Sequence, residues 1–343
     1  MRLLVLGQII AAFQIAAAQT TPSGAAPSVV YVAHNPAAIK GYKTDPPIVR
    51  SMVNRLVTAV TNQPNVVAAW NSLVSPKEKI GIKISATGGE IFTTHRDIVN
   101  AIVDGLAAAG HRPESIVVWD RSLEGAAAAG YKAETYRLAS VAPRDGYDAK
   151  AVVSAPILGK LVWGDYEYVG GTALPLSDTE NTSTISHFAR VLTTDVTKVI
   201  NVPVMSDSET NGIAGCIYNM TVPNVDNWRR FTQSTRFGGA SLAEIYSDPM
   251  IEKKVILNIM DGLIAEYAGG PQAYPNFQLH HATIYASRDP VAIDAVALKE
   301  IEEWRQRAKV PALGPRAMHV EAAAQLGLGN AAPERIQIRT VSP

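Results

Sequence analysis

Residues 198–220 read K-V-I-N-V-P-V-M-S-D-S-E-T-N-G-I-A-G-C-I-Y-N-M. The first part of this stretch is rich in β-branched residues, which favour a buried strand. The sequence then turns polar over residues 206–211, and two glycines follow. Open α/β sheets build ligand sites where buried strands deliver polar side chains into loops at their carboxyl ends. We therefore predict a strand that ends in a ligand-binding loop, with the alternative that Asp207 or Ser208 only caps a following helix.

Apolar residues recur with strand or helix spacing along most of the chain. Strands are predicted at 28–34, 79–85, 115–119, 255–260, 282–286 and 335–341. Helices are predicted at 46–60, 98–109, 123–138, 184–191, 290–304 and 318–326. The strand, helix and strand over 79–120 predict two parallel neighbours, because such crossovers are right-handed. Thr94 and Asp97 resemble a capping box for the helix predicted at 98–109.

The expected fold class is α/β, with a mainly parallel sheet flanked by helices and an inserted β-rich segment at 140–190. The chain has 343 residues, of which 47% are hydrophobic and 18% charged, so we expect a large core and a single domain over 29–343. Its 31 basic and 31 acidic residues give a net charge of zero. We therefore expect no nucleic-acid partner, since that would need a basic excess on one face.

The first 18 residues resemble a secretory signal peptide. Arg2 precedes an apolar run that ends in alanines 16–18, an A-x-A type cleavage site. The run is short for a membrane span, although an uncleaved anchor is the alternative. Residues 19–28 read as a linker of small residues. We therefore expect a periplasmic or secreted protein with no stable membrane span after cleavage.

Missing motifs exclude several kinds of chemistry. Cys216 is the only cysteine, so an intrachain disulfide, a cysteine-ligated iron–sulfur cluster and a cysteine zinc site are ruled out. Its apolar neighbours predict a small buried hydrophobe rather than a nucleophile. The chain also lacks the G-x-S-x-G, G-x-G-x-x-G and H-E-x-x-H motifs.

Charged and polar residues follow several predicted strands. If these strands are parallel, their carboxyl ends share one edge of the sheet and these side chains converge there. The candidates for acid–base catalysis are His95, Asp207 and Lys83. The candidates for substrate binding are Arg96, Asp120, Arg121, Asn211, Asn219 and Arg288. Asp207 and Asp261 would also suit a divalent metal, because hard cations prefer oxygen ligands.

Most candidates also have a structural explanation. Helix capping explains Asp120, Thr94 and Asp289, a turn explains Asp261, and a solvent-facing position explains His95. Asp207 and Asn219 have the weakest structural explanations, which makes them the stronger functional candidates. Lys83 stands in an apolar strand, where a lysine has no structural role unless it faces solvent.

Several segments together resemble a known bacterial family. They are G-I-K-I-S (81–85), T-T-H-R-D-I-V-N-A-I-V-D-G-L-A-A-A-G (93–110), I-V-V-W-D-R-S (116–122), the stretch 201–220, I-M-D-G-L-I-A-E-Y-A-G-G-P (259–271) and A-S-R-D-P-V-A-I-D-A-V-A (286–297). In this order they are similar to the family named domain of unknown function 362, over residues 78–300.

The resemblance implies no activity, because the family carries no settled reaction. Many relatives bear ferredoxin-type cysteine motifs, and this chain bears none, so electron transfer through a cluster is not implied. The family pattern has Asp207 flanked by Lys and His, and a Lys before Asn219. This chain has Ser206, Ser208 and Tyr218 there. Chemistry that depends on those missing side chains is not carried over.

Three kinds of function stay open. We expect an enzyme acting on a small polar or anionic molecule at the carboxyl ends of the strands, with no cofactor identified. A periplasmic binding or sensing protein that uses the same pocket without turnover is the alternative. The aromatic stretch 228–237 would serve a structural or interaction partner.

Overall fold

The computed structural model describes residues 26–133, 135–141, 145–153, 186–232 and 238–342. The predicted signal peptide and most of the predicted insertion at 140–190 lie outside these ranges. In the described ranges, every helix is too short or too polar to cross a bilayer.

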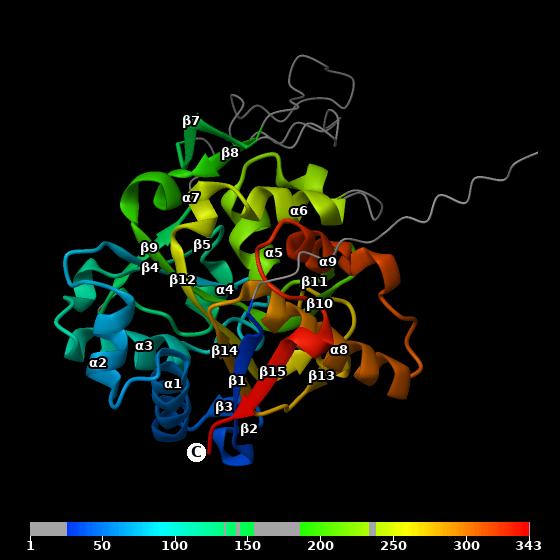
Figure 1. The fold of residues 1–343 in the computed structure, drawn as a ribbon, viewed down its shortest axis with the longest axis horizontal. Coiled ribbons are helices and arrows are strands. Elements are labelled where there is room, and N and C mark those ends of the chain that lie inside the picture. Colours follow the sequence, from blue (N-terminus) through cyan, green and yellow to red (C-terminus); the bar gives the residue numbers. More distant parts are fainter. Residues whose placement is uncertain (1–25, 134, 142–144, 154–185, 233–237, 343) are drawn as a thin grey trace, which may run out of the picture.

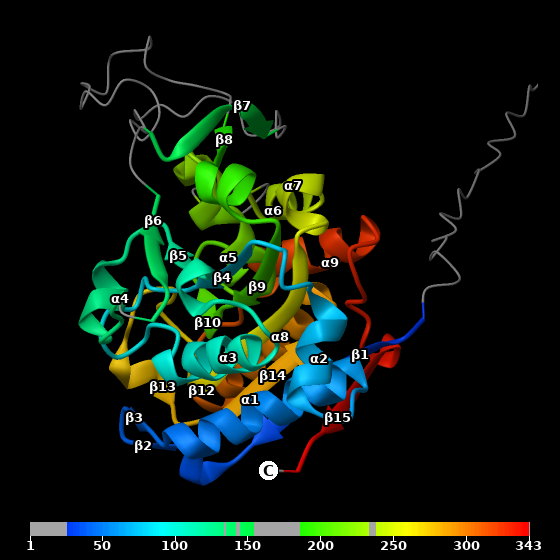
Figure 2. The same ribbon diagram turned by 90° about the vertical axis from the view of Figure 1, so that its left-hand side faces the viewer.

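A sheet of 11 strands forms the centre of the molecule, with the main order β15-β1-β14-β12-β9-β4-β5-β6 (Figure 1). Its strands are β1 Ser28–His34, β4 Ile80–Ile84, β5 Val117–Asp120, β6 Arg137–Ser140, β9 Lys198–Val202, β10 Val204–Ser208, β11 Gly212–Ile213, β12 Val255–Glu266, β13 Gln278–Leu279, β14 Thr283–Ser287 and β15 Ile336–Thr340. Two small antiparallel sheets pair β2 Ile39–Lys40 with β3 Lys43–Thr44, and β7 Tyr147–Val153 with β8 Ser186–Ala189. The two-stranded sheet of β7 and β8 lies at one end of the molecule, at the top in Figures 1 and 2.

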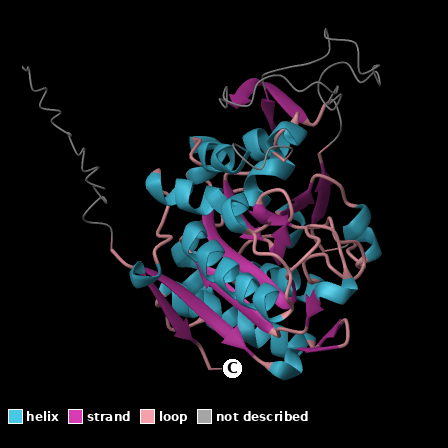
Figure 3. Cartoon of the chain, turned by 90° about the vertical axis from the view of Figure 1, so that its right-hand side faces the viewer, coloured by secondary structure: helices cyan, strands magenta, loops and turns pink. Residues whose placement is uncertain are grey.

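Helices cover both faces of the sheet, as Figure 3 shows. One face carries α1 Pro46–Thr61, α2 Val66–Leu73 and α3 Arg96–Ala108, and the other carries α5 Cys216–Thr221, α6 Gly238–Tyr246, α8 Pro290–Arg307 and α9 Met318–Gln325. The short helices are α4 Glu124–Ala128 and α7 Pro249–Glu252. Each face buries its own hydrophobic cluster. The α/β fold with a mainly parallel sheet is confirmed.

The order of the strands reverses between β4 and β9. From β4 the chain passes through α3 to β5 and on to β6, moving to one side, whereas β9 pairs with the other side of β4. Helix α3 follows β4 onto one face, and α5 follows β9 onto the other. In open α/β sheets, such a switch point leaves a crevice at the carboxyl ends of the two strands, and ligands bind there.

Strands β6, β5, β4, β9 and β12 are parallel, as predicted for β4 and β5. β14 is antiparallel to β12, with Ser287 opposite Asn258 near the start of β12. Parallel strands need a long crossover, usually a helix. The connection from β12 to β14 contains only a three-residue helical turn and β13. Because β14 is antiparallel, Arg288 at its carboxyl end lies beside the amino-terminal ends of the parallel strands. The prediction that Arg288 joins the other candidates at the carboxyl ends was wrong.

Three predicted helical features were also wrong. The helix predicted at 123–138 ends at Ala128, and β6 follows. The segment predicted as a helix at 184–191 contains β8. Thr94 does not cap α3: His95 is the N-cap residue, without a side-chain cap, and Thr94 Oγ1 donates to the carbonyl of Val202. Asp289 does cap α8, by accepting from the Ala292 amide at 2.9 Å.

Two strands run further than the sequence indicated. Ser206 to Ser208 belong to β10, which pairs with β11 and β12, so the predicted loop begins only after Ser208. β12 continues through Asp261 to Glu266. Asp261 and Asp207 are therefore held by rigid strands rather than by loops.

Candidate functional site

A buried ion pair joins the ends of β4 and β5. Lys83 Nζ lies 2.6 Å from Asp120 Oδ1, 2.6 Å from the carbonyl of Ile84 and 3.0 Å from Asn219 Oδ1. The Lys83 side chain is 0% exposed. Burial lowers the pKa of Lys83, and the charge and hydrogen bond of Asp120 oppose this effect. Because removing an ammonium from water costs several kcal/mol, a lysine here is an expensive choice for packing alone.

Asp120 is held firmly in place. Its Oδ2 accepts from the amide of Ala86 at 2.6 Å, and its Oδ1 accepts from the amide of Arg121 at 2.7 Å. Each hydrogen bond to a carboxylate is stronger than one between neutral groups. Asp120 therefore ties the loop after β4 to the end of β5.

Three asparagines continue this polar network into the sheet. Asn219 Nδ2 donates to Asn201 Oδ1 at 2.8 Å, and Asn201 Nδ2 donates to Asn258 Oδ1 at 2.9 Å. Asn201 in β9 pairs in register with Lys83 in β4 on one side and with Asn258 in β12 on the other. The side chains of Lys83, Asn201 and Asn258 therefore share one face of the sheet. The network fixes the orientation of Asn219 and, through it, of the lysine.

A pocket of about 610 Å³ opens beside this ion pair, and Asp120 forms part of its wall. The loops after β4, β5 and β12 surround it, together with α4, Tyr218 and Trp228. Arg121 and Glu124 also line it and supply charges of both signs. The Arg121 guanidinium carbon lies 4.3 Å from the centre of a Trp228 ring, which fixes the cation by a cation–π contact.

His95 and Asp261 form a second pair at the same edge. His95 Nδ1 and the His95 backbone amide each lie 2.7 Å from Asp261 Oδ2. Burial alone would lower the pKa of His95, but the Asp261 carboxylate outweighs it and raises that pKa. The ring is 13% exposed, and the pair lies outside the pocket wall. Such a dyad can exchange a proton with a molecule that reaches Nε2.

Asp207 lies in a third cluster. Its Oδ1 accepts from the amide of Gly270 at 2.9 Å, and its Oδ2 lies 3.3 Å from Arg305 Nη1. Burial raises the pKa of Asp207 to about 7, although Gly270 and Arg305 act in the opposite direction. Asp207 is not part of the pocket wall, but Pro271, which follows Gly270, is.

The remaining candidates lie apart. Arg96 Nη1 donates to the carbonyl of Gly130, and Asn211 Nδ2 donates to the carbonyl of Phe231. Asp207 and Asp261 bind different partners. Across the described ranges, no three His, Cys, Asp or Glu side chains are grouped to hold a metal ion. The structure therefore brings together Lys83, Asp120, Asn219 and Arg121 from the sequence-based set.

The sequence reasoning overlooked Asn201, Asn258 and Glu266. The signal for the two asparagines was present, since each interrupts an apolar strand, as Lys83 does. The sequence predicts Trp228 only as a partner contact, and it marks Tyr218 only as a departure from the family pattern. Tyr218 lies in α5 and Trp228 in the helical turn Trp228–Phe231, so their place in the pocket depends on tertiary packing, which no local pattern reveals.

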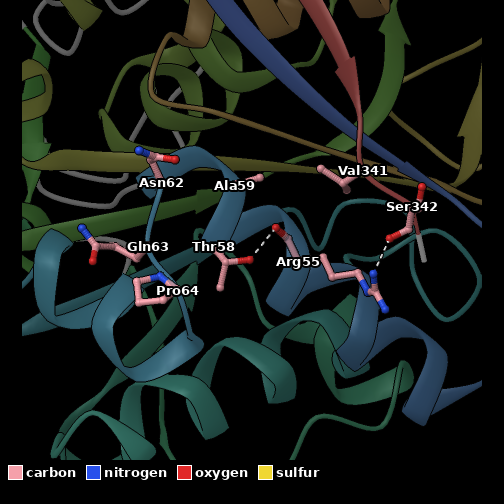
Figure 4. Close-up of a pocket in the computed structure, with 8 residues that line it drawn as sticks. All are labelled: Arg55, Thr58, Ala59, Asn62, Gln63, Pro64, Val341 and Ser342. Carbon is pink, nitrogen blue, oxygen red and sulfur yellow. Dashed lines mark hydrogen bonds between the residues drawn. The ribbon is translucent and has the colours of Figure 1, made fainter.

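A second hollow, of about 590 Å³, lies between the end of α1 and the residues after β15 (Figure 4). Arg55 Nη1 donates there to the carbonyl of Ser342 at 2.7 Å. Thr58 Oγ1 donates to the Arg55 carbonyl at 2.9 Å. These hydrogen bonds connect the residues after β15 to α1 and join residues within α1. None of the predicted site residues lines this hollow.

Comparison with a family model supports the family resemblance. No curated protein matches the chain. A crystal structure of a Thermotoga maritima protein, a target of the Northeast Structural Genomics Consortium, is similar with a TM-score of 0.43 and 10% identity. That match covers 79% of this chain and 61% of the other. The family described as domain of unknown function (DUF362) matches residues 79–299, well over half of the chain. The chain therefore belongs to the DUF362 family.

Proposed function

We propose that the protein is an enzyme that binds a small polar or anionic molecule in the pocket at the ends of β4 and β5. The observation that carries this proposal is the position of Asp120, which lines the pocket and contacts the buried Lys83 at 2.6 Å. Arg121 would pair with an anionic group of the ligand, and Glu124 or Asp120 with a hydroxyl group.

The Lys83–Asp120 pair would serve the acid–base step. Burial lowers the pKa of Lys83, so its amine can exchange a proton closer to neutral pH than an exposed lysine can. The amine itself is 0% exposed and does not line the pocket. A proton would therefore pass between Lys83 and the ligand through the Asp120 carboxylate, which makes Lys83 a positioning residue.

The inaccessible amine also favours the second candidate, a binding or sensing protein without turnover. In that case Lys83 only holds the Asp120 carboxylate at the pocket wall. The two candidates share the pocket and differ in whether Asp120 transfers a proton.

The variant Asp120→Asn distinguishes an enzyme from a binding protein. Ligands are first found by thermal-shift screening of sugars, hydroxy acids and phosphates, because a ligand of the folded state raises Tm. For an enzyme, we expect the variant to lower turnover of such a ligand at least about 100-fold, in the range of acid–base catalysis, with a much smaller change in Kd. Surface variant Ala127→Ser is the control.

For a binding protein, the same variant would weaken Kd and no turnover would be found in the wild type. If Asp120→Asn changes neither Kd nor turnover of any hit, the pocket is not the functional site.

A further inference from the structure

Residues 267–277 connect β12 to β13 and form a strap beside the pocket. Pro271 and Gln272, in the middle of this strap, line the same pocket as Asp120 at the end of β5. The position of the strap therefore sets the shape of one pocket wall.

Carboxylates hold the strap on both sides of Pro271 and Gln272. Asp207 Oδ1 accepts from the Gly270 amide at 2.9 Å, and Glu266 Oε2 accepts from the Tyr274 amide at 2.6 Å. Glu209 Oε1 accepts from the Gly269 amide at 3.2 Å. Asp207 and Glu266 are both 0% exposed. The strap thus closes over two carboxyl groups that would be hydrated if it opened.

Few charges compensate these carboxyl groups. Arg305 Nη1 lies 3.3 Å from Asp207 Oδ2, but it also lies 3.5 Å from Glu209, whose other oxygen pairs with Arg316 at 3.2 Å. Glu266 Oε2 also accepts from Gln278 Nε2 at 2.9 Å. Glu266 Oε1 is buried with no hydrogen-bond partner, and no cation contacts Glu266 in the described residues.

We propose that Asp207 and Glu266 form a proton-controlled clasp, which keeps the strap closed on the pocket while they are neutral and releases it when they ionise. The regulatory role rests on the proposed ligand site, because the strap is a wall of that pocket. The clasp itself needs no ligand.

The direction of the pH dependence follows from the linkage between proton binding and closure of the strap. Burial raises the pKa of Asp207 and of Glu266 to about 7 each, and the charge of Asp207 adds to the effect on Glu266. A hydrated carboxyl group titrates near pH 4. The closed strap therefore binds more protons than an open one at pH 5 to 7, so protonation favours closure. As the pH rises towards 7, ionised carboxyl groups are hydrated only in the open strap, so closure becomes less favourable. Above about pH 7 the closed strap buries two carboxylates, including the unpaired Glu266 oxygen.

Native-state hydrogen exchange of the ligand-free protein tests the clasp. The readouts are the amides of Gly270 and Tyr274, corrected for their intrinsic exchange rates, between pH 5 and 9. Between pH 5 and about pH 7 we expect protection to fall about tenfold per pH unit for each carboxyl group, or about 100-fold per pH unit for both, and to level off above about pH 7. The amides of β4 report global opening, and at each pH the strap amides should show lower protection than the β4 amides, because the strap opens without global unfolding.

Variants decide which groups are responsible. Asp207→Asn with Glu266→Gln should give a protection that does not change with pH. Glu266→Gln alone should reduce the slope to that of one proton. Asp294→Asn removes a buried carboxyl group away from the strap, and it should leave the slope of Gly270 and Tyr274 unchanged.

The clasp is overturned if the wild-type strap shows the same protection at pH 5 and pH 9, or if the doubly neutral variant keeps the wild-type slope. Neither result depends on a ligand. Failure of the clasp and failure of the pocket as a ligand site are therefore separate outcomes.

Discussion

Replacing Asp120 with alanine is expected to lower the free energy of unfolding by about 3–5 kcal/mol. The variant leaves the Lys83 ammonium buried with only neutral acceptors, the Ile84 carbonyl and Asn219 Oδ1. It also removes the acceptor of the Ala86 and Arg121 amides. An unpaired buried charge is among the most costly defects in a protein interior. Denaturant unfolding at pH 7 measures the loss.

The matched control is Lys83→Met, which removes the other partner at similar volume. Asp120 keeps its two backbone donors and lies at the pocket, where water can reach it. We expect a smaller loss, of about 1–2 kcal/mol, the size of lost hydrogen bonds. Equal losses for the two variants would contradict the view that the lysine, rather than the carboxylate, is the group that depends on its partner.

The protein is expected to be less stable at pH 8 than at pH 6, by about 4 kcal/mol in sum if three buried carboxyl groups act independently. Burial raises the pKa of Asp207, Glu266 and Asp294 to about 7 each. In the unfolded chain these groups titrate near pH 4. The folded state therefore holds protons that the unfolded state has released, and this stabilisation is lost as the pH rises through 7. Each group contributes about 1.4 kcal/mol over this interval.

Two histidines bear on the same profile. Asp261 raises the pKa of His95, which adds to the loss of stability as the pH rises. Burial lowers the pKa of His319 to about 4, so its opposing effect falls mostly below pH 6.5. The interval from pH 6 to pH 8 therefore excludes most of the His319 effect, whereas His95 changes stability there in the same direction as the carboxyl groups.

Denaturant midpoints at pH 6 and pH 8, at one ionic strength, measure the pH dependence. Asp294→Asn should reduce the difference between the two pH values by about a third, because one of the three carboxyl groups is removed. A wild-type protein that is equally stable at both pH values would show that these carboxyl groups are hydrated in solution.

The main strands and the edge where β4 and β5 end could be predicted from the sequence, because buried parallel strands are nearly continuous apolar runs. Lys83 and Asp120 were found in this way. Arg288 was misplaced because nothing in the residues 282–289 states which way a strand runs. Its direction follows from the connection after β12, which has no crossover helix.

The clasp could not be found from local patterns. Asp207 and Glu266 are far apart in sequence, and they become neighbours of one strap only because β10 pairs with β12 beyond Asp261. Arg305 reaches Asp207 from the far end of α8. Such a cluster depends on register and helix packing, which are properties of the whole fold.

The most direct test of the pocket as a ligand site is a pair of tryptophan substitutions in α4. Ala128 and Ala127 are adjacent and exposed, but only Ala128 lines the pocket. Ala128→Trp should fill part of the pocket, whereas Ala127→Trp adds the same bulk outside it. Titration calorimetry with a ligand from the thermal-shift screen is predicted to show at least about tenfold weaker binding for Ala128→Trp, about 1.4 kcal/mol, and wild-type affinity for Ala127→Trp. Wild-type affinity in both variants would contradict the account.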